Sequence, residues 1–219
     1  MIDSHCHLDR CEDPALAADP ALAAMVTVGT DLERSKAALA AARRHHNVYA
    51  AVGVHPNDAS RAADEATRAG VEELAEHPLV VAIGETGLDY YRTQGEANWD
   101  IQKYAFKRHI ELAVELGLAL QIHDREAHDD VIATLLSMEQ LPKHVVFHSY
   151  SGDEHMAEIL NEHGWYASFS GVVTFKNNDS ARRAAQVMRP ELLLVETDSP
   201  FLTPHPHRGR PNAPYLVPY

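Results

Sequence analysis

Histidines and carboxylates recur at matched positions along this 219-residue sequence, and their side chains suit a metal centre. His5 and His7 stand two residues apart in a short segment near the start of the chain. On a strand, a spacing of two places both imidazoles on one face and turns Cys6 to the other. A single His-x-His pair is weak support for a metal site, because histidines at strand ends often pack in a core or cap a loop.

Four more residues with metal-binding side chains follow later apolar runs. They are Glu85 after Gly84, His123 after Ile122, His148 after Phe147 and Asp198 before Ser199. Taken alone, Asp198 fits a simple turn in Thr-Asp-Ser-Pro. Together, four imidazoles and two carboxylates form a mixed nitrogen and oxygen set for divalent cations. Six ligands exceed the needs of one tetrahedral catalytic ion, so we expect two ions, with Glu85 able to bridge them through its two oxygens.

The segments that position these residues alternate between sequences typical of strands and sequences typical of helices. Short apolar runs predict eight strands, and amphipathic segments with cap residues predict about seven helices between them. The strands are expected at 2–6, 25–29, 48–54, 79–83, 118–122, 145–147, 165–169 and 192–195, and the clearest helices at 31–46, 64–76, 96–116, 126–137, 153–163 and 179–188.

This alternation predicts an α/β fold, a (β/α)₈ TIM barrel in which residues 1–219 form a single domain. A doubly wound open sheet is the alternative. In a barrel, all six candidate ligands lie at the carboxyl ends of strands, where active sites form. The proline-rich segment 203–219 offers no helix to close the barrel after the last strand. We therefore expect apolar surface on the first and last strands, which favours instability or a weak homo-oligomer.

Composition limits the class of protein. The formal net charge of −13 argues against a surface built for non-specific binding of nucleic acid, although a nuclease with metal ions and a small basic patch stays open. The sequence shows no signal-peptide pattern and no apolar run of about 20 residues. Cys6 and Cys11 are expected to be free thiols, and the protein is expected to be cytoplasmic, with no membrane partner.

Several motifs resemble those of the TatD family of metal-dependent deoxyribonucleases, within the amidohydrolase-like barrels. The resemblance runs in order along nearly the whole chain. The matching text is DSHCHLD at 3–9, VGVHP at 52–56, GETGLDY at 84–90, QIH at 121–123, FHSYSG at 147–152, ETDSP at 196–200, PHRG at 206–209 and Asn212. The departures from the family pattern are Ser149, where a cysteine is common, Ser199, and the absent terminal helix.

The resemblance implies a role for each ligand. His5, His7, Glu85 and Asp198 would hold one ion, and Glu85 with His123 and His148 the second, the ions being Mg²⁺, Mn²⁺ or Zn²⁺. A water activated by the metal would attack phosphorus, and Asp198 would act as general base. The implied activity is hydrolysis of DNA phosphodiester bonds, trimming strand ends as an exonuclease does, with single-stranded DNA or DNA ends as the substrate.

Substrate contacts are predicted from position. Arg125, Arg208 and His207 adjoin ligand loops and could bind phosphate, although a surface turn explains the last two equally well. Tyr90 could stack on a base or pack in the core. His55 could line the pocket or only fix its turn. Asp9 is expected to orient a ligand histidine as a hydrogen-bond acceptor.

Two other classes of function remain open. The same kind of barrel also cleaves amides, esters or lactones, including the ester of a mis-charged aminoacyl-tRNA. Related barrels often bridge their metals with a carbamylated lysine on the fourth strand, and Glu85 at that place favours the nuclease branch. The second class is an inactive, truncated metal-binding paralogue, against which the presence of all six ligands argues.

Overall fold

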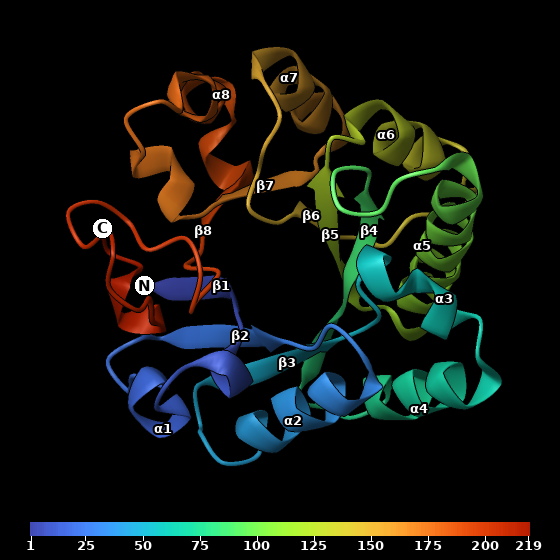
Figure 1. Cartoon of the computed structure of the whole chain (residues 1–219), viewed down its shortest axis with the longest axis horizontal. Coiled ribbons are helices and arrows are strands. Elements are labelled where there is room, and N and C mark those ends of the chain that lie inside the picture. Colours follow the sequence, from blue (N-terminus) through green and yellow to red (C-terminus); the bar gives the residue numbers. More distant parts are fainter.

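Eight parallel strands form one sheet in chain order, which confirms the predicted barrel (Figure 1). A computed structural model describes the backbone of residues 1–219 and every side chain except that of Leu16. Neighbouring strands pair from β1 to β8. The strands are β1 Ile2–Cys6, β2 Ala24–Val28, β3 Val48–Val52, β4 Val80–Asp89, β5 Ala119–Arg125, β6 Val145–Phe147, β7 Tyr166–Phe169 and β8 Leu193–Val195.

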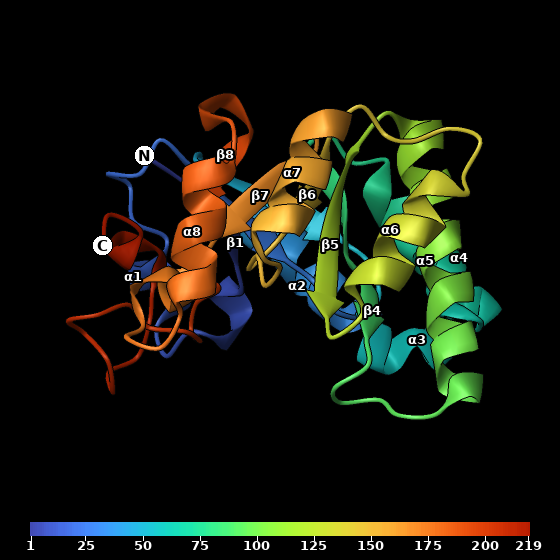
Figure 2. The same cartoon turned by 90° about the horizontal axis from the view of Figure 1, so that it is seen from above.

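The helices form a ring outside the strands (Figures 1 and 2). Side chains of Asp31, Asp64 and Asp153 accept hydrogen bonds from the first turns of three helices, and left-handed Gly117 and Gly164 end two. The helices are α1 Pro14–Ala17, α2 Leu32–Ala42, α3 Ala59–Ala62, α4 Glu65–Ala75, α5 Glu96–Leu116, α6 His128–Leu136, α7 Glu154–His163 and α8 Asp179–Val187. None of the described helices combines the length and hydropathy that crossing a membrane requires.

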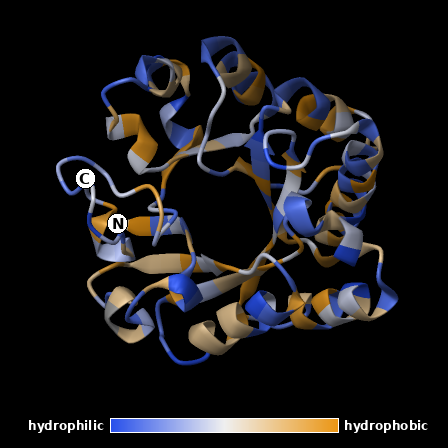
Figure 3. Ribbon diagram, in the orientation of Figure 1, coloured by the Kyte–Doolittle hydropathy of each residue, from blue (hydrophilic) through white to orange (hydrophobic). Residues whose placement is uncertain are grey.

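The core lies mainly between the strands and these helices. Ile83, Phe106, Leu120 and Leu160 are fully buried there. Figure 3 shows apolar colour on much of the strand ring, with hydrophilic stretches on the helices. Such double-sided burial explains why parallel strands read as nearly continuous apolar runs in the sequence.

The junction between β8 and β1 is held by different hydrogen bonds from those that pair the other neighbouring strands. Beyond the end of β8, the backbone N–H of Asp198 donates to His5 O at 2.9 Å, and Ser199 O accepts from the N–H of His7 at 2.8 Å. The buried carboxylate of Asp3 accepts hydrogen bonds from Thr197 N at 2.9 Å and from Thr197 Oγ1 at 2.6 Å. The side chain of Asp3 therefore supplies hydrogen bonds that backbone pairing between two strands would otherwise supply.

The outer surface of this junction is apolar and exposed, as the sequence predicted. Ile2 is 52% exposed and Val195 37%. The described residues after β8 contain no α-helix, only the 3₁₀ turn Pro214–Leu216. The two ends of the chain lie near each other beside β1 in Figures 1 and 2.

Candidate metal centre

His5 and His7 lie side by side inside the barrel mouth, as their spacing predicted. Both side chains are buried, and their Nε2 atoms are 3.4 Å apart. Cys6 points the other way, and its thiol donates to Val26 O. Strand alternation thus separates two candidate ligands from a core residue within three positions.

Glu85 belongs to β4 itself, which continues through Asp89 rather than ending near residue 83 as expected. Two glycines allow this extension. A Cβ at Gly84 would lie 2.5 Å from Gln121 O, and one at Gly87 would lie 2.1 Å from His123 O, and both glycines have positive φ. The sequence Gly-Glu-Thr-Gly therefore lets β4 lie close against β5, with Glu85 and His123 in contact.

His148 and Asp198 complete the group from two loops. His148 directly follows β6 and is buried, and Asp198 comes three residues after the end of β8. Asp198 has a left-handed backbone with φ of 52°, a conformation that aspartate tolerates better than most residues. The structure therefore brings together all six residues that the sequence singled out as ligands.

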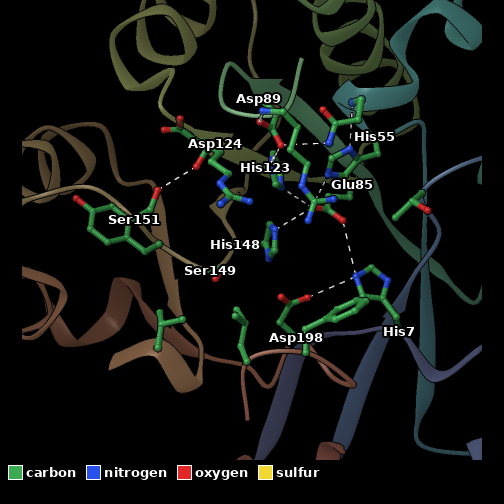
Figure 4. A pocket seen from close by; sticks show the side chains of 18 of the residues that line it. His7, His55, Glu85, Asp89, His123, Asp124, His148, Ser149, Ser151 and Asp198 are labelled. Carbon is green, nitrogen blue, oxygen red and sulfur yellow. Dashed lines mark hydrogen bonds and ion pairs between the residues drawn. The ribbon is translucent and has the colours of Figure 1, made fainter. Parts of the chain in front are cut away.

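The two carboxylate oxygens of Glu85 face two different sets of histidines (Figure 4). Oε1 lies 2.7 Å from His123 Nδ1 and 2.9 Å from His148 Nε2. Oε2 lies 3.8 Å from the Nε2 atoms of both His5 and His7. On that second side, Asp198 Oδ1 is 3.5 Å from His7 Nε2. Glu85 thus stands between two groups of ligand atoms, as a bridging carboxylate would.

Each of the four histidines uses its outer ring nitrogen for a hydrogen bond to an acceptor. His5 Nδ1 donates to Gln121 Oε1 at 3.0 Å, and His7 Nδ1 to Val28 O at 2.9 Å. The Oε1 end of Gln121 is fixed by the amide nitrogen, which donates to Ser4 O.

On the other side, His123 Nε2 donates to Asp89 Oδ2 at 3.1 Å, and His148 Nδ1 to Glu196 Oε1 at 3.1 Å. A proton on each outer nitrogen leaves the inner nitrogen with a lone pair for a cation. The donor set and its tautomers therefore fit divalent metal ions.

Opposite charges within the centre stabilise one another and shift the pKa of its groups. Burial disfavours ionised Glu85, but the surrounding imidazoles hold its pKa well below the usual range. Burial also disfavours charged His148, yet Glu85 and Glu196 raise its pKa well above the ordinary value. For His5, burial and the nearby His148 lower the pKa. Because histidine binds a cation only in its neutral form, a cation at this centre would displace the proton that the two glutamates favour on His148.

A cavity of about 770 Å³ opens over the centre, a size typical of a small-molecule or cofactor site. Of the predicted substrate residues, Arg125 and His55 line it. His55 Nδ1 accepts a hydrogen bond from Asn57 N, so neutral His55 carries its proton on Nε2, which is 3.4 Å from Glu85 Oε1.

Three other predicted contacts lie outside this cavity. The ring of Tyr90 stacks on Trp99, and its hydroxyl donates to Asp130 at 2.5 Å. Arg208 lies over the ring of Phe175, and His207 packs edge-on against Tyr219. The three side chains therefore pack against neighbouring rings. Their positions in the sequence, beside the ligand loops, did not predict this packing.

The expectation for Asp9 was wrong. Its carboxylate pairs with Arg34 at 2.6 Å and makes no hydrogen bond to a histidine among the described side chains. The residues that do orient the ligands are Gln121, Asp89 and Glu196, which the sequence reasoning did not assign. Asp89 and Glu196 stand within the quoted GETGLDY and ETDSP segments, and that proximity was the only signal for them.

Comparison with known protein families and structures agrees with this geometry. Residues 2–219 match the family model described as TatD related DNase. The chain belongs to the TatD family. A relative from Mycobacterium tuberculosis, named uncharacterized metal-dependent hydrolase TatD, is 44% identical and is matched over 100% of this chain and 87% of its own length. The metal-dependent hydrolase YcfH of Escherichia coli K12 is 37% identical over 99% and 84%.

Solved structures support the same placement within the TatD family. The crystal structure of YjjV, a TatD homologue from Escherichia coli, superposes with a TM-score of 0.89 and 26% identity, covering 99% of this chain and 86% of that one. Dihydropyrimidinase from Brevibacillus agri, at 14% identity and a TM-score of 0.51, shares the fold. The chain is a metal-dependent hydrolase of the TatD family with an amidohydrolase-like barrel.

Proposed function

We propose that this TatD-family hydrolase cleaves phosphodiester bonds of DNA at a centre of two divalent ions. The observation that carries the proposal is the position of Glu85, whose two oxygens face two separate groups of ligand atoms. His5, His7 and Asp198 would share one ion with Glu85. His123 and His148 would share the other, with Mg²⁺, Mn²⁺ or Zn²⁺ as the candidates.

Each side chain then has a definable part in hydrolysis. When bound, the ions lower the pKa of water towards neutrality and draw charge from the phosphate. Asp198, with 14% of its side chain exposed at the cavity, accepts the proton of the attacking water as a general base. The water oxygen bonds to phosphorus, and the bond to the leaving nucleoside oxygen breaks with its electron pair. His55, which lines the cavity, would donate a hydrogen bond from Nε2 to a phosphate oxygen.

The test combines metal content with DNA digestion. Purified protein is analysed for bound metal and incubated with single-stranded DNA, with and without a chelator. We expect cleavage that needs metal, and a loss of about 10²- to 10⁴-fold in rate for Asp198→Asn. Glu85→Ala should also lose one bound ion. Asp129→Asn, an exposed position on α6, is the matched control and should behave as wild type.

Metal-dependent cleavage that survives both ligand substitutions would contradict the proposal. Small phosphodiesters, carboxylic esters and aminoacyl-tRNA are offered in parallel. Faster hydrolysis of an ester than of any phosphodiester would instead assign the centre to the ester- and amide-cleaving branch. Full metal occupancy without hydrolysis of any of these substrates would support an inactive paralogue.

A further inference from the structure

Seven arginines have no carboxylate oxygen within 4.0 Å among the described side chains, and three of these seven line one cavity. On the outer helices, Arg61 and Arg108 each have a carboxylate oxygen within 4.0 Å. Arg10, Arg92 and Arg125 line the cavity, and none of them has such a partner among the described side chains. On a protein with a formal charge of −13, unpaired guanidinium groups gathered at one cavity indicate binding of an anion.

Two of these arginines lie over aromatic rings. The guanidinium of Arg125 is 4.0 Å from the ring centre of Tyr91, and that of Arg10 is 5.8 Å from the ring centre of Phe201. Both rings are open to solvent, with Phe201 44% and Tyr91 52% exposed. Exposed aromatic rings combined with arginine are typical of surfaces that hold single-stranded nucleic acid, through stacked bases and bound phosphates.

The two pairs stand on opposite walls of the barrel mouth. Arg10 follows β1 and Phe201 follows β8, whereas Arg125 ends β5 and Tyr91 follows β4. In a ring of eight strands in chain order, β8 and β1 lie across from β4 and β5 (Figure 1). The metal centre, with ligands from both walls, lies between them.

Arg10 carries a further sign of a missing partner. Its NH2 group donates to Thr30 Oγ1 at 3.2 Å, but its Nε is buried and has no hydrogen-bond partner among the described residues. Phe201 also reaches towards the metal centre, with its ring centre 6.1 Å from that of His7. The Arg10 and Phe201 pair therefore adjoins the ligands directly.

We propose that these pairs hold one nucleic-acid strand on both sides of the cleaved phosphate, Arg10 with Phe201 on one wall and Arg125 with Tyr91 on the other. This rests on the proposed phosphodiesterase function. The occupant is a single strand, because bases must be unstacked to lie on open rings and guanidinium planes. It follows that a linkage within an oligonucleotide, with a nucleotide held on each side, is a better substrate than a phosphodiester that carries no nucleotides.

The charge of the cavity makes this binding depend on metal. Five carboxylates line the cavity, Asp58, Glu85, Asp89, Asp124 and Asp198, against the three arginines. The carboxylates outnumber the arginines by two, and two divalent ions would add four positive charges between them. A strand should therefore bind after the ions.

The test compares a substrate without nucleotides to one with them. Rates are measured for bis(p-nitrophenyl) phosphate and for single-stranded dodecathymidylate, using wild type, Arg10→Met and Arg125→Met. For each variant, KM for the oligonucleotide should rise about tenfold more than KM for the small diester, and the slope of log affinity against log salt should shrink by about 0.7. Arg44→Met, exposed just after α2 and far from the centre, should leave both substrates unchanged.

A second experiment tests whether the two arginines bind phosphates on different sides of the cleaved linkage. An uncharged methylphosphonate replaces the neighbouring phosphate on either the 5′ or the 3′ side, and KM is measured. We expect one of the two replacements to leave the KM of Arg10→Met unchanged, and the other to leave that of Arg125→Met unchanged. If both variants respond to the same replacement, or if Arg10→Met binds and cleaves as wild type does, the two-sided arrangement is overturned. If wild type cleaves neither substrate, the phosphodiesterase function fails instead. Fluorescence anisotropy of the labelled oligonucleotide on the Mn²⁺-loaded Asp198→Asn protein then still tests the two pairs.

Discussion

The barrel has two very different junctions on its opposite sides. β4 and β5 contribute ten and seven residues and stay paired as far as Asp89 and Arg125. The long helix α5 packs outside β4, and Ile83 and Leu120 are fully buried there. β8 has only three residues, and its junction with β1 relies on the Asp3 carboxylate, with Ile2 and Val195 open to solvent.

The candidate metal centre takes its residues from both junctions. Glu85 and His123 come from the well-packed side, whereas His5, His7 and Asp198 come from the sparsely packed one. One half of the centre is therefore positioned by the core and the other by a few hydrogen bonds. Bound ions would themselves join the two halves.

Replacing Asp3 should have the largest effect, and only on one junction. Asp3→Ala leaves the buried N–H of Thr197 without an acceptor, and we expect a loss of about 2–4 kcal/mol in the free energy of unfolding. Asp3→Asn, which keeps the shape, should lose less and remain folded. Urea unfolding measures the loss, and hydrogen exchange should accelerate at residues 1–7 and 193–199 more than at 80–89.

The control for this experiment is Asp64→Ala, which removes the N-cap of α4 and should cost about 1 kcal/mol. Equal acceleration of exchange at both junctions would contradict the special role of Asp3.

The orienting residues allow each half of the centre to be weakened separately. Asp89→Asn removes the charge that faces His123, and Gln121→Leu removes the acceptor for His5. We expect each substitution to reduce affinity for one of two Mn²⁺ ions by about 10- to 100-fold, and each a different one. Calorimetric titration with Mn²⁺ measures both. Loss of the same binding event in both variants would show that the two halves are not independent.

A buried histidine tests the well-packed side and should give the smallest effect. His109 on α5 donates from Nδ1 to Ala105 O at 2.7 Å and accepts at Nε2 from Val54 N at 3.1 Å. Burial lowers its pKa, so below pH 6.5 the unfolded chain binds a proton that the folded protein does not. Stability should therefore fall as the pH drops from 7.5 to 5.5, by about 1 kcal/mol through this group.

His109→Gln should remove that part of the pH dependence when urea midpoints are compared at both values. His46, exposed after α2, provides the matched control as His46→Gln. An identical pH dependence in wild type and His109→Gln would show that His109 ionises equally in both states.

What the sequence predicted well depended on short-range periodicity. Eight apolar runs predicted eight strands, and the two-residue spacing of His5 and His7 placed both on one face. What it missed depended on partners far along the chain. Asp89 lies 34 residues from His123 and Gln121 lies 116 residues from His5, so their contacts exist only in the folded barrel.

Asp9 shows the same limit in reverse, because Arg34 is 25 residues away and takes the carboxylate that was assigned to a histidine. Arg10 and Phe201 are 191 positions apart in sequence and become neighbours only because β1 and β8 are adjacent. Glycines at 84 and 87 resembled the end of a strand, but close packing against β5 made them part of it.

The distribution of the ligands along the chain has a consequence for synthesis. The first candidate ligand lies at residue 5 and the last at residue 198, and Glu85 faces histidines from both halves of the centre. A growing chain therefore possesses no complete centre until nearly all of the barrel has left the ribosome. Hydrolytic activity therefore arises only together with the finished fold.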